Sequence, residues 1–373
     1  MINGSNGIII DLSALEHNLR QIRALTVQGT RIMGIVKSDA YGHGLLPVSH
    51  TLEKANIDCL GVAHMKDALK LRNDGIKLPI IILCGIQTEE ESCKVVENSF
   101  TPVIFDINAA DMLNQVSSRQ GRITPVHLKV DTGMGRLGIL PGEIKAFIRK
   151  AKELKNLNIE ALLSHLSSAD EHSGEFTKKQ IRAFGKTIEA VRSMGLALPF
   201  NSLASSAGLA GYPDAHFEMV RPGIMLYGGL PSPKYLSDIP LKPVMTFKGR
   251  VLQIRDLPGR TPVSYGRTYY TKGPSRIAVL SAGYGNGLPR NISNLGSVII
   301  KNRRVPIVGT ICMDLTMCDV TGLDGVKVGS EVIFLGSDEN ETITCEDIAG
   351  WSDSISYEVL CSIGHQNTKE YIS

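Results

Sequence analysis

The sequence predicts an α/β protein in two parts, an N-terminal (β/α)8 TIM barrel followed by a C-terminal domain that is mainly β. Two observations predict this fold. From residue 30 to about 222, eight short apolar runs alternate with helical patterns, and beyond residue 233 strand-like runs follow one another with almost no helix between them. A chain of 373 residues with 43% hydrophobic residues is long enough for two such domains.

The eight apolar runs of the first part lack strict alternation, which is typical of strands buried on both faces of a parallel sheet. They are residues 32–37, 59–64, 79–84, 102–106, 125–131, 159–166, 199–205 and 217–223. Helical patterns, with apolar residues three and four apart, lie at 65–74, 108–120, 141–154 and 176–194. We expect a first helix to begin with a capping box of Ser13 and Glu16 and to run to about Leu25. The count favours a closed barrel over an open doubly wound sheet, which shows the same alternation with fewer strands.

The second part is expected to be a separate β domain. Its strand-like runs cover 249–254, 276–284, 296–302, 305–320 and 330–336, with Gly, Pro and Asn turns between them. A short helix is expected near 346–351 and a final apolar stretch near 357–363. We place the barrel at residues 1–235 and the β domain at 236–373, with the option that the first residues join the β domain.

Charge and composition exclude several classes of partner. The 40 Lys and Arg residues nearly balance 37 Asp and Glu, and the resulting charge of +3 argues against a nucleic-acid or anionic-membrane partner. The sequence has no run of 18 apolar residues, so no membrane span is expected. The start lacks a signal peptide's basic and apolar regions, and seven cysteines form no CxxC pair. We therefore expect a cytoplasmic protein with reduced thiols and no metal site.

Polar residues gather at the ends of the predicted barrel strands. In such a barrel the C-terminal ends of the strands line the active-site mouth. Two lysines, two histidines and an arginine at these ends predict a cationic mouth that suits a phosphate, a carboxylate or both. The whole set is Lys37, His64, Cys84, Asp106, Lys129, Asp131, His165, Asn201, Ser202 and Arg221.

Lys37 has two interpretations from its position alone. A lysine at a strand end most often packs its stem on apolar neighbours and keeps its amine in water. Burial would instead lower its pKa and give a neutral amine that condenses with an aldehyde. His165 and Arg221 likewise have two interpretations, as structural or as functional residues. Ser202 and the glycine at 223 add a hydroxyl and an approachable backbone, which are typical of a phosphate cradle in barrels.

A glycine motif offers a rival fold. Residues 133–138 read GMGRLG and match the dinucleotide-binding pattern G-x-G-x-x-G, with Glu160 roughly 20 residues further on. In that fold the helix begins inside the glycine motif, yet Pro141 and Gly142 stand where its first turns should be. The helical pattern restarts at Pro141, so a glycine loop between the fifth strand and its helix is the better interpretation.

Nine motifs, taken together and in order, resemble those of the alanine racemases. They are VKSDAYGHG (36–44), HLKVDTGMGRLG (127–138), LSHLSSAD (163–170), NSLAS (201–205), VRPGIMLYG (220–228), VSYGRTY (263–269), AGYGNGLPR (282–290), GTICMD (309–314) and SYEVLC (356–361). The resemblance covers nearly the whole chain. Two stretches depart from the family pattern, since Thr310 stands where an arginine often precedes the CMD segment and the tail after Tyr357 lacks the usual arginine-proline-arginine ending.

The resemblance implies a pyridoxal 5'-phosphate enzyme of fold type III that works as a head-to-tail homodimer with shared active sites. It implies that Lys37 holds the cofactor and is one of two bases, and that Tyr265 of the partner subunit is the other. Arg221 would bond the pyridine nitrogen with support from His165, and Arg136 would bind the substrate carboxylate. The remaining implied positions are the phosphate-binding Tyr41, Ser202, Gly223, Ile224 and Tyr357, the carboxylate contact Met313, the often carbamylated Lys129, the entrance tyrosine Tyr284, and the supporting Cys312 and Asp314.

The activity so implied is the racemisation of L- and D-alanine, which supplies D-alanine for the peptidoglycan of the cell wall. Three alternatives stay open. Another small amino acid such as serine could be the substrate, because the departures leave the pocket's width undefined. A fold-type III amino-acid decarboxylase would share the lysine and the phosphate cradle, but should lack Tyr265 as a base and place an acid, not Arg221, at the ring nitrogen. A cofactor-carrying barrel without enzyme activity is usually a single domain.

Overall fold

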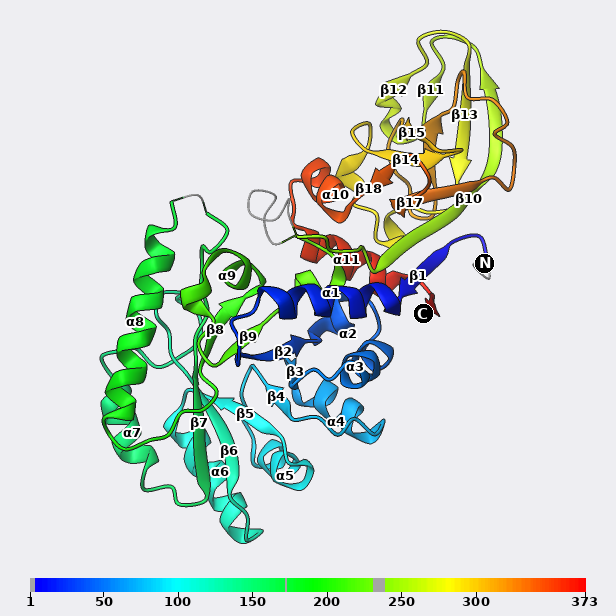
Figure 1. Cartoon of the computed structure of the whole chain (residues 1–373). Helices are drawn as coiled ribbons and strands as arrows, with labels where there is room; N and C mark the ends of the chain where they lie inside the picture. The colour runs from blue at the N-terminus through cyan, green and yellow to red at the C-terminus, as the bar shows by residue number, and fades with distance from the viewer. Residues whose placement is uncertain (1–3, 172, 231–238) are drawn as a thin grey trace.

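Eight parallel strands close into the predicted barrel (Figure 1). They are β2 (Arg31–Ile35), β3 (Cys59–Val62), β4 (Ile80–Ile82), β5 (Thr101–Ile104), β6 (Thr124–Lys129), β7 (Leu157–Leu163), β8 (Ser202–Ser205) and β9 (Met219–Arg221). The barrel closes where β2 pairs with β9, with Arg31 opposite Met219 and Ile32 opposite Val220. In this computed structural model residues 4–171, 173–230 and 239–373 are described.

Helices cover the outside of the barrel and connect its strands. They are α1 (Leu12–Leu25), α3 (Leu45–Lys54), α4 (Met65–Asn73), α5 (Glu89–Asn98), α6 (Ile107–Arg119), α7 (Ile144–Ala151), α8 (Glu175–Arg192) and α9 (Ser206–Gly211). The short element α2 (Lys37–Tyr41) is a left-handed turn after β2 and not a regular helix. Their apolar faces are buried against the strands, as the spacing of apolar residues predicts; in α8 these include Phe184, Ile188 and Val191. Two short 3-10 turns, Pro213–Ala215 and Ile224–Tyr227, flank β9.

Three predicted boundaries in the barrel are wrong. The first helix is capped by Asp11, whose carboxylate accepts from the amides of Ser13 and Ala14, so the capping box of Ser13 and Glu16 does not form. The helix predicted over 141–154 begins only at Ile144, because residues 140–143 form a turn closed by the Glu143 amide on the Leu140 carbonyl. The strand predicted over 199–205 begins at Ser202, where it pairs with Leu163 of β7 and Met219 of β9.

The C-terminal domain is built on a nine-stranded sheet that also includes the start of the chain. Strand β1 (Gly7–Asp11) lies between the long β10 (Met245–Leu257) and the last strand β19 (Lys369–Ile372). The other strands of the domain are β11 (Pro262–Val263), β12 (Tyr269–Tyr270), β13 (Ser275–Leu280), β14 (Ser297–Ile300), β15 (Arg303–Pro306), β16 (Thr316–Asp319), β17 (Glu331–Ser337) and β18 (Thr342–Ile343). The predicted boundary between residues 235 and 236 lies in 231–238, outside the described residues.

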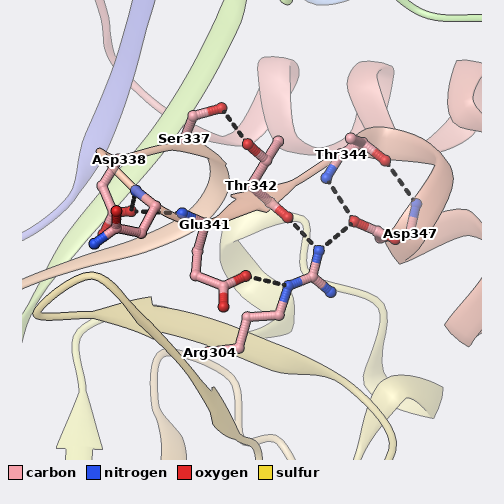
Figure 2. Close-up of polar contacts among 8 residues, drawn as sticks. Arg304, Ser337, Asp338, Glu341, Thr342, Thr344 and Asp347 are labelled. Carbon is pink, nitrogen blue, oxygen red and sulfur yellow. Dashed lines mark hydrogen bonds and ion pairs between the residues drawn. The ribbon is translucent and has the colours of Figure 1, made fainter.

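Two helices, α10 (Cys345–Ser352) and α11 (Ser356–Gln366), follow the sheet and lie on the side of the domain that faces the barrel (Figure 1). Arg304 of β15 anchors the start of α10: it donates to the Thr342 carbonyl and forms ion pairs with Glu341 at 3.2 Å and Asp347 at 3.1 Å (Figure 2). Thr344 and Asp347 complete a capping box at the same helix end (Figure 2). These contacts fix the helix pair that reaches the barrel mouth.

Helix α11 approaches the barrel very closely through two glycines. A Cβ atom on Gly364 would lie 2.3 Å from the carbonyl oxygen of Gly42, and one on Gly42 would lie 2.6 Å from the Leu360 carbonyl oxygen. A side chain at either position would therefore push α11 away from the segment that follows β2. On the same side, the Tyr357 ring of α11 lies 5.9 Å from the Tyr41 ring of the segment that follows β2, measured between ring centres.

Candidate active site

A cavity of about 360 Å³ lies at the C-terminal ends of the barrel strands. This volume is in the range of a small-molecule site. Its charged lining residues are all cations or neutral bases: among the described residues no carboxylate lines it. The lining consists of Ile35, Lys37, Tyr41, Ala63, Leu83, Cys84, Lys129, Arg136, Leu137, Leu163, His165, Ser205, Ser206, Arg221, Gly223, Ile224 and Tyr357.

Lys37 enters this cavity from a turn of unusual hand. It lies two residues after the end of β2, and the next four residues, 38–41, all have φ between 53° and 55°, which is a left-handed turn. For L-residues this conformation costs roughly 1–2 kcal/mol per residue, so other contacts must hold it. The Asp39 carboxylate accepts from the amide of Leu45 at 2.8 Å, and His43 Nδ1 lies 3.0 Å from the Ala40 carbonyl oxygen and 2.9 Å from that of Tyr41. Because both partners are acceptors, Nδ1 carries the proton.

The surroundings of Lys37 favour the neutral form of its amine more than water does. Burial lowers its pKa, because the charged form loses its hydration, and the nearby Arg136 and Arg221 lower it further by repulsion. The expectation that burial makes this lysine a better nucleophile therefore has a physical cause in the structure. No described carboxylate pairs with the amine across the cavity.

Arg221 is buried at the end of β9 and is fully engaged by neighbours. One guanidinium nitrogen donates to the Ser202 hydroxyl at 2.6 Å; the other donates to the Ser164 carbonyl at 2.6 Å and lies 3.4 Å from His165 Nδ1, which accepts. Burial lowers the pKa of Arg221 to about 9, which still leaves it charged at neutral pH. Burial and the charge of Arg221 hold the pKa of His165 well below its usual value, so its ring is neutral.

Lys129 and Arg136 complete the cationic side of the cavity. Burial, Arg221 and Arg136 together hold the pKa of Lys129 well below its usual value. The glycine loop that carries Arg136 is folded around Asp131, whose carboxylate accepts from the amides of Gly133, Met134 and Arg136 at 2.7–3.0 Å. Although burial opposes it, these amides lower the pKa of Asp131. The motif that resembled a dinucleotide loop thus positions an arginine at the cavity.

The opposite side of the cavity is rich in hydroxyl groups, and at Gly223 it has no side chain. The Ser206 hydroxyl accepts from the Gly223 amide at 3.0 Å, and a Cβ atom on Gly223 would lie 2.3 Å from the Tyr41 hydroxyl oxygen. The Tyr41 ring stacks on Tyr227 at 4.8 Å and lies 5.9 Å from the Tyr357 ring. Burial raises the pKa of both Tyr41 and Tyr357, the latter to about 12, so both remain protonated donors.

Ser202 is not one of the residues whose hydroxyls line the cavity, contrary to the sequence prediction. Because β8 begins at Ser202, this residue lies below the cavity, where its hydroxyl donates to the Met219 carbonyl and accepts from Arg221. The strand end is Ser205, and Ser205 and Ser206 line the cavity instead. The signal that could have found them is the pair of serines directly before the glycine-rich run 207–211.

Asp131, which folds the glycine loop, does not line the cavity, and three other predicted strand-end residues also lie elsewhere. His64 precedes α4 and is exposed, Asp106 caps α6 by accepting from Asn108 and Ala109, and Asn201 accepts from the Leu162 amide inside the barrel wall. None of the three lines the cavity. The apolar wall of Ile35, Ala63 and Leu83 was not predicted as part of the site, since such residues look the same as the core.

Of the candidate residues in the C-terminal domain, only Tyr357 lines the cavity of its own chain among the described residues, and the others lie outside it. Tyr265, Tyr284 and Met313 have exposed fractions of 68%, 41% and 56%. Tyr284 and Met313 are joined through the main chain, because the amides of Tyr284 and Gly285 donate to the carbonyls of Cys312 and Met313 at 3.0 and 2.7 Å. Asp314 lies beside Gly285 in the same loop pair. These residues form an exposed face. None of them lines the cavity that contains Lys37 of the same chain.

Within the described residues, the helices are too short or too polar to serve as membrane spans.

Sequence and structure comparisons relate this chain to known proteins. The family model described as alanine racemase, N-terminal domain, matches residues 10–231, and that of the C-terminal domain matches 244–371. A curated alanine racemase of Thermodesulfovibrio yellowstonii is 43% identical over 366 residues, which is 97% of this chain and 96% of that protein. A solved alanine racemase of Clostridium difficile 630 is 33% identical with a TM-score of 0.91, covering 100% of this chain and 97% of that one. The alanine racemase of Bartonella henselae, solved with covalently bound pyridoxal phosphate, is 29% identical with a TM-score of 0.88, covering 99% and 100%.

Proposed function

Because the chain belongs to the alanine racemase family, we propose that it interconverts L- and D-alanine with pyridoxal 5'-phosphate and one base on each face of the substrate. The observation that carries the proposal is Lys37, a partly desolvated amine that shares a cavity with Arg221. No carboxylate lines that cavity among the described residues. An acid at the ring nitrogen is what a decarboxylase of this fold would use, so the lining favours the racemase.

The residues of the cavity fit the cofactor. Lys37 would hold its aldehyde carbon, and the opposite side offers hydroxyls of Tyr41, Ser206 and Tyr357 for the phosphate. The Gly223 position admits no side chain beside Tyr41, so a phosphate could approach the main chain there, in competition with the Ser206 hydroxyl that accepts from the Gly223 amide. The role first assigned to Ser202 therefore passes to Ser206, with Gly223 and Ile224 as implied. The bound cofactor supplies the electron withdrawal that makes the Cα proton of an amino acid acidic.

Arg221 and His165 would face the ring nitrogen of the cofactor. A guanidinium charged at neutral pH donates hydrogen bonds and keeps that nitrogen unprotonated. Ser202 acts through Arg221, since its hydroxyl accepts from the guanidinium. We infer that this arrangement weakens the electron withdrawal and so limits side reactions.

Lys37 would be the base for one face of the substrate, once its amine is released from the cofactor. Its lowered pKa places more of it in the neutral form that accepts a proton. Tyr265 from a second copy of the chain would serve the other face. When Lys37 takes the Cα proton of D-alanine, the Tyr265 hydroxyl gives a proton to the opposite face; from L-alanine the two groups exchange roles.

The second copy follows from where Tyr265 lies. Its side chain is 68% exposed, and neither it nor Met313 lines the cavity of its own chain. We propose a homodimer in which the face with Tyr265, Tyr284, Cys312, Met313 and Asp314 closes the partner's cavity. Tyr284 would then guard the entrance.

Arg136, with the main-chain amide of Met313 from the partner, would bind the substrate carboxylate. Lys129 lies among cations with a lowered pKa, which favours the neutral amine that reacts with carbon dioxide. A carbamate on Lys129 would place a negative charge beside Arg136 and orient it. A cytoplasmic role in supplying D-alanine for peptidoglycan completes the proposal.

Deuterium incorporation tests the reaction. The purified protein with pyridoxal phosphate is incubated in D2O with L-alanine, and optical activity, deuterium at Cα and carbon dioxide are followed. We expect loss of optical activity, one deuterium at Cα and no carbon dioxide. Carbon dioxide release, or intact optical activity with both alanine and serine, would overturn the proposal. Borohydride reduction should attach the cofactor to Lys37, and Lys37→Arg is the control that loses this label.

A further inference from the structure

The turn that carries Tyr265 has a backbone that its own residues do not favour. It spans Tyr265–Arg267 between β11 and β12. Ser264, which precedes it, has φ 65° and ψ −172°, and Arg267 has φ 52°. The first pair of angles lies in a region occupied almost only by glycine and costs of order 1–3 kcal/mol for another residue. Such a turn persists only where its surroundings hold it.

The neighbouring segment 309–312 holds this turn in place. The Thr310 hydroxyl donates to the Tyr265 carbonyl at 2.9 Å, and the Ser264 hydroxyl donates back to the Thr310 carbonyl. Thr310 is buried, so these bonds are partly shielded from water. Gly309 allows the approach: a Cβ atom there would lie 2.7 Å from the Val263 carbonyl oxygen and 2.9 Å from Ser264 Cβ.

A second layer of polar contacts holds Thr310 itself. Its hydroxyl lies 3.3 Å from that of Thr268, which accepts from the Asn294 side-chain amide at 3.1 Å. The Asn294 side-chain oxygen accepts from the Gly309 amide at 2.6 Å. Both ends of the turn are thus tied to the same segment, and the hydroxyl of Thr310 stands between them.

From this geometry we infer that Thr310 is a positioning residue for Tyr265. The Tyr265 side chain is 68% exposed, so the direction in which it leaves the domain is set by its main chain more than by side-chain packing. Thr310 holds that main chain at the carbonyl of Tyr265 itself. The inference rests on the proposed function, in which Tyr265 delivers a proton to one face of the substrate. Thr310 acts through Tyr265 and touches neither substrate nor cofactor.

Loss of the Thr310 hydroxyl should therefore slow proton delivery by Tyr265 and leave Lys37 unchanged. Removal of one such hydrogen bond is worth about 1 kcal/mol, a factor of about 5. With D-alanine in D2O, Lys37 removes the Cα proton, and a deuteron then returns either from Lys37 to the same face or from Tyr265 to the opposite face. The ratio of exchange without inversion to inversion reports the balance of the two bases. Loss of folded or loaded enzyme changes both rates equally and leaves the ratio unchanged.

The variants are made in the full-length holoenzyme. We expect Thr310→Val to raise the ratio about fivefold and Thr310→Ser, which keeps the hydroxyl, to restore it. Thr187→Val is the matched control, because its hydroxyl also donates to a main-chain carbonyl, that of Ala183, but on the outer helix α8. This control should keep the wild-type ratio.

A second readout needs no reaction. Amide hydrogen exchange of the peptide around Tyr265 should speed up in Thr310→Val, with or without cofactor, and not in Thr187→Val. If Thr310→Val keeps both the wild-type ratio and the wild-type amide exchange, the inference is overturned. A wild-type enzyme that does not racemise alanine overturns the proposed function instead, and the amide exchange still decides whether Thr310 holds the turn.

Discussion

The ammonium group of Lys369 lies 3.2 Å from the carboxylate of Asp39. This ion pair joins the last strand, β19, to the left-handed turn behind Lys37. Nearby, a Cβ atom on Gly44 would lie 2.0 Å from the Tyr371 hydroxyl oxygen, so the same strand packs directly on the turn. The tail that departs from the family pattern is therefore a support of the turn that carries Lys37.

Lys369→Ala should loosen this turn and weaken cofactor binding. The pair is partly buried, with exposed side-chain fractions of 16% and 30%, so its loss should cost about 1 kcal/mol. That corresponds to roughly a fivefold rise in the dissociation constant of pyridoxal phosphate, measured by absorbance titration of the apoprotein. Lys369→Arg should recover most of the affinity, and Lys327→Ala, at an exposed lysine, is the control. Equal affinities in all four proteins would contradict the role of the pair.

Substitutions of Ser206 and Ser202 should differ in their effect on the affinity for cofactor and phosphate. Ser206→Ala removes a hydroxyl from the cavity and should lower the affinity for both pyridoxal phosphate and inorganic phosphate, by about 5-fold. Ser202→Ala leaves the cavity lining intact and removes an acceptor of Arg221, so it should leave phosphate affinity near wild type. Both are measured by titration of the apoprotein. The reverse order of effects would return the phosphate role to Ser202.

Tyr265→Phe tests the second base. Removal of a general acid–base group should lower racemisation by about 10²–10⁴-fold. Because L- and D-alanine have equal free energies, kcat/KM must fall equally in the two directions, and the face served by Tyr265 shows only in isotope exchange. In D2O the variant should still exchange the Cα proton of D-alanine through Lys37, and should exchange that of L-alanine far more slowly. Equal exchange of both enantiomers would argue against the assignment of faces.

His43 should make the protein sensitive to acid. Burial lowers its pKa to about 4 from an ordinary value of 6.5, so between these values the unfolded chain binds more protons. The free energy of unfolding should then fall as the pH falls from about 6.5 to about 4, by up to about 1.4 kcal/mol per pH unit from this residue.

His43→Asn is the matched variant, since an amide keeps a donor for the carbonyls of Ala40 and Tyr41 but does not titrate. Urea unfolding at several pH values should show a shallower acid slope in the variant. Identical slopes would mean that the burial of His43 does not contribute to acid unfolding. The buried His127, with a pKa lowered to about 4 by burial and Arg221, adds a similar slope in both proteins.

The sequence by itself determined the architecture and the chemical type of the site. Eight apolar runs predict eight buried strands, because only strands covered on both faces can be apolar without alternation. Lys37 at the end of the first run and Arg221 at the end of the last then meet, since a closed barrel brings all strand ends to one mouth. These features depend on local pattern and on a fold that closes in one way.

Only the tertiary structure decided which residues of each run reach that mouth. An apolar run predicts a strand but not its first residue, which is set by pairing: β8 begins where Ser202 meets Leu163 and Met219, so Ser206 and not Ser202 reaches the cavity. The left-handed turn after Lys37 is opposed by its own residues and is held by Asp39 with Lys369, far along the chain. In the sequence, Thr310 is only a departure from a motif. In the structure, its hydroxyl donates a hydrogen bond to the carbonyl of Tyr265. Contacts between distant segments carry no periodic signal, and they fix where the reactive groups point.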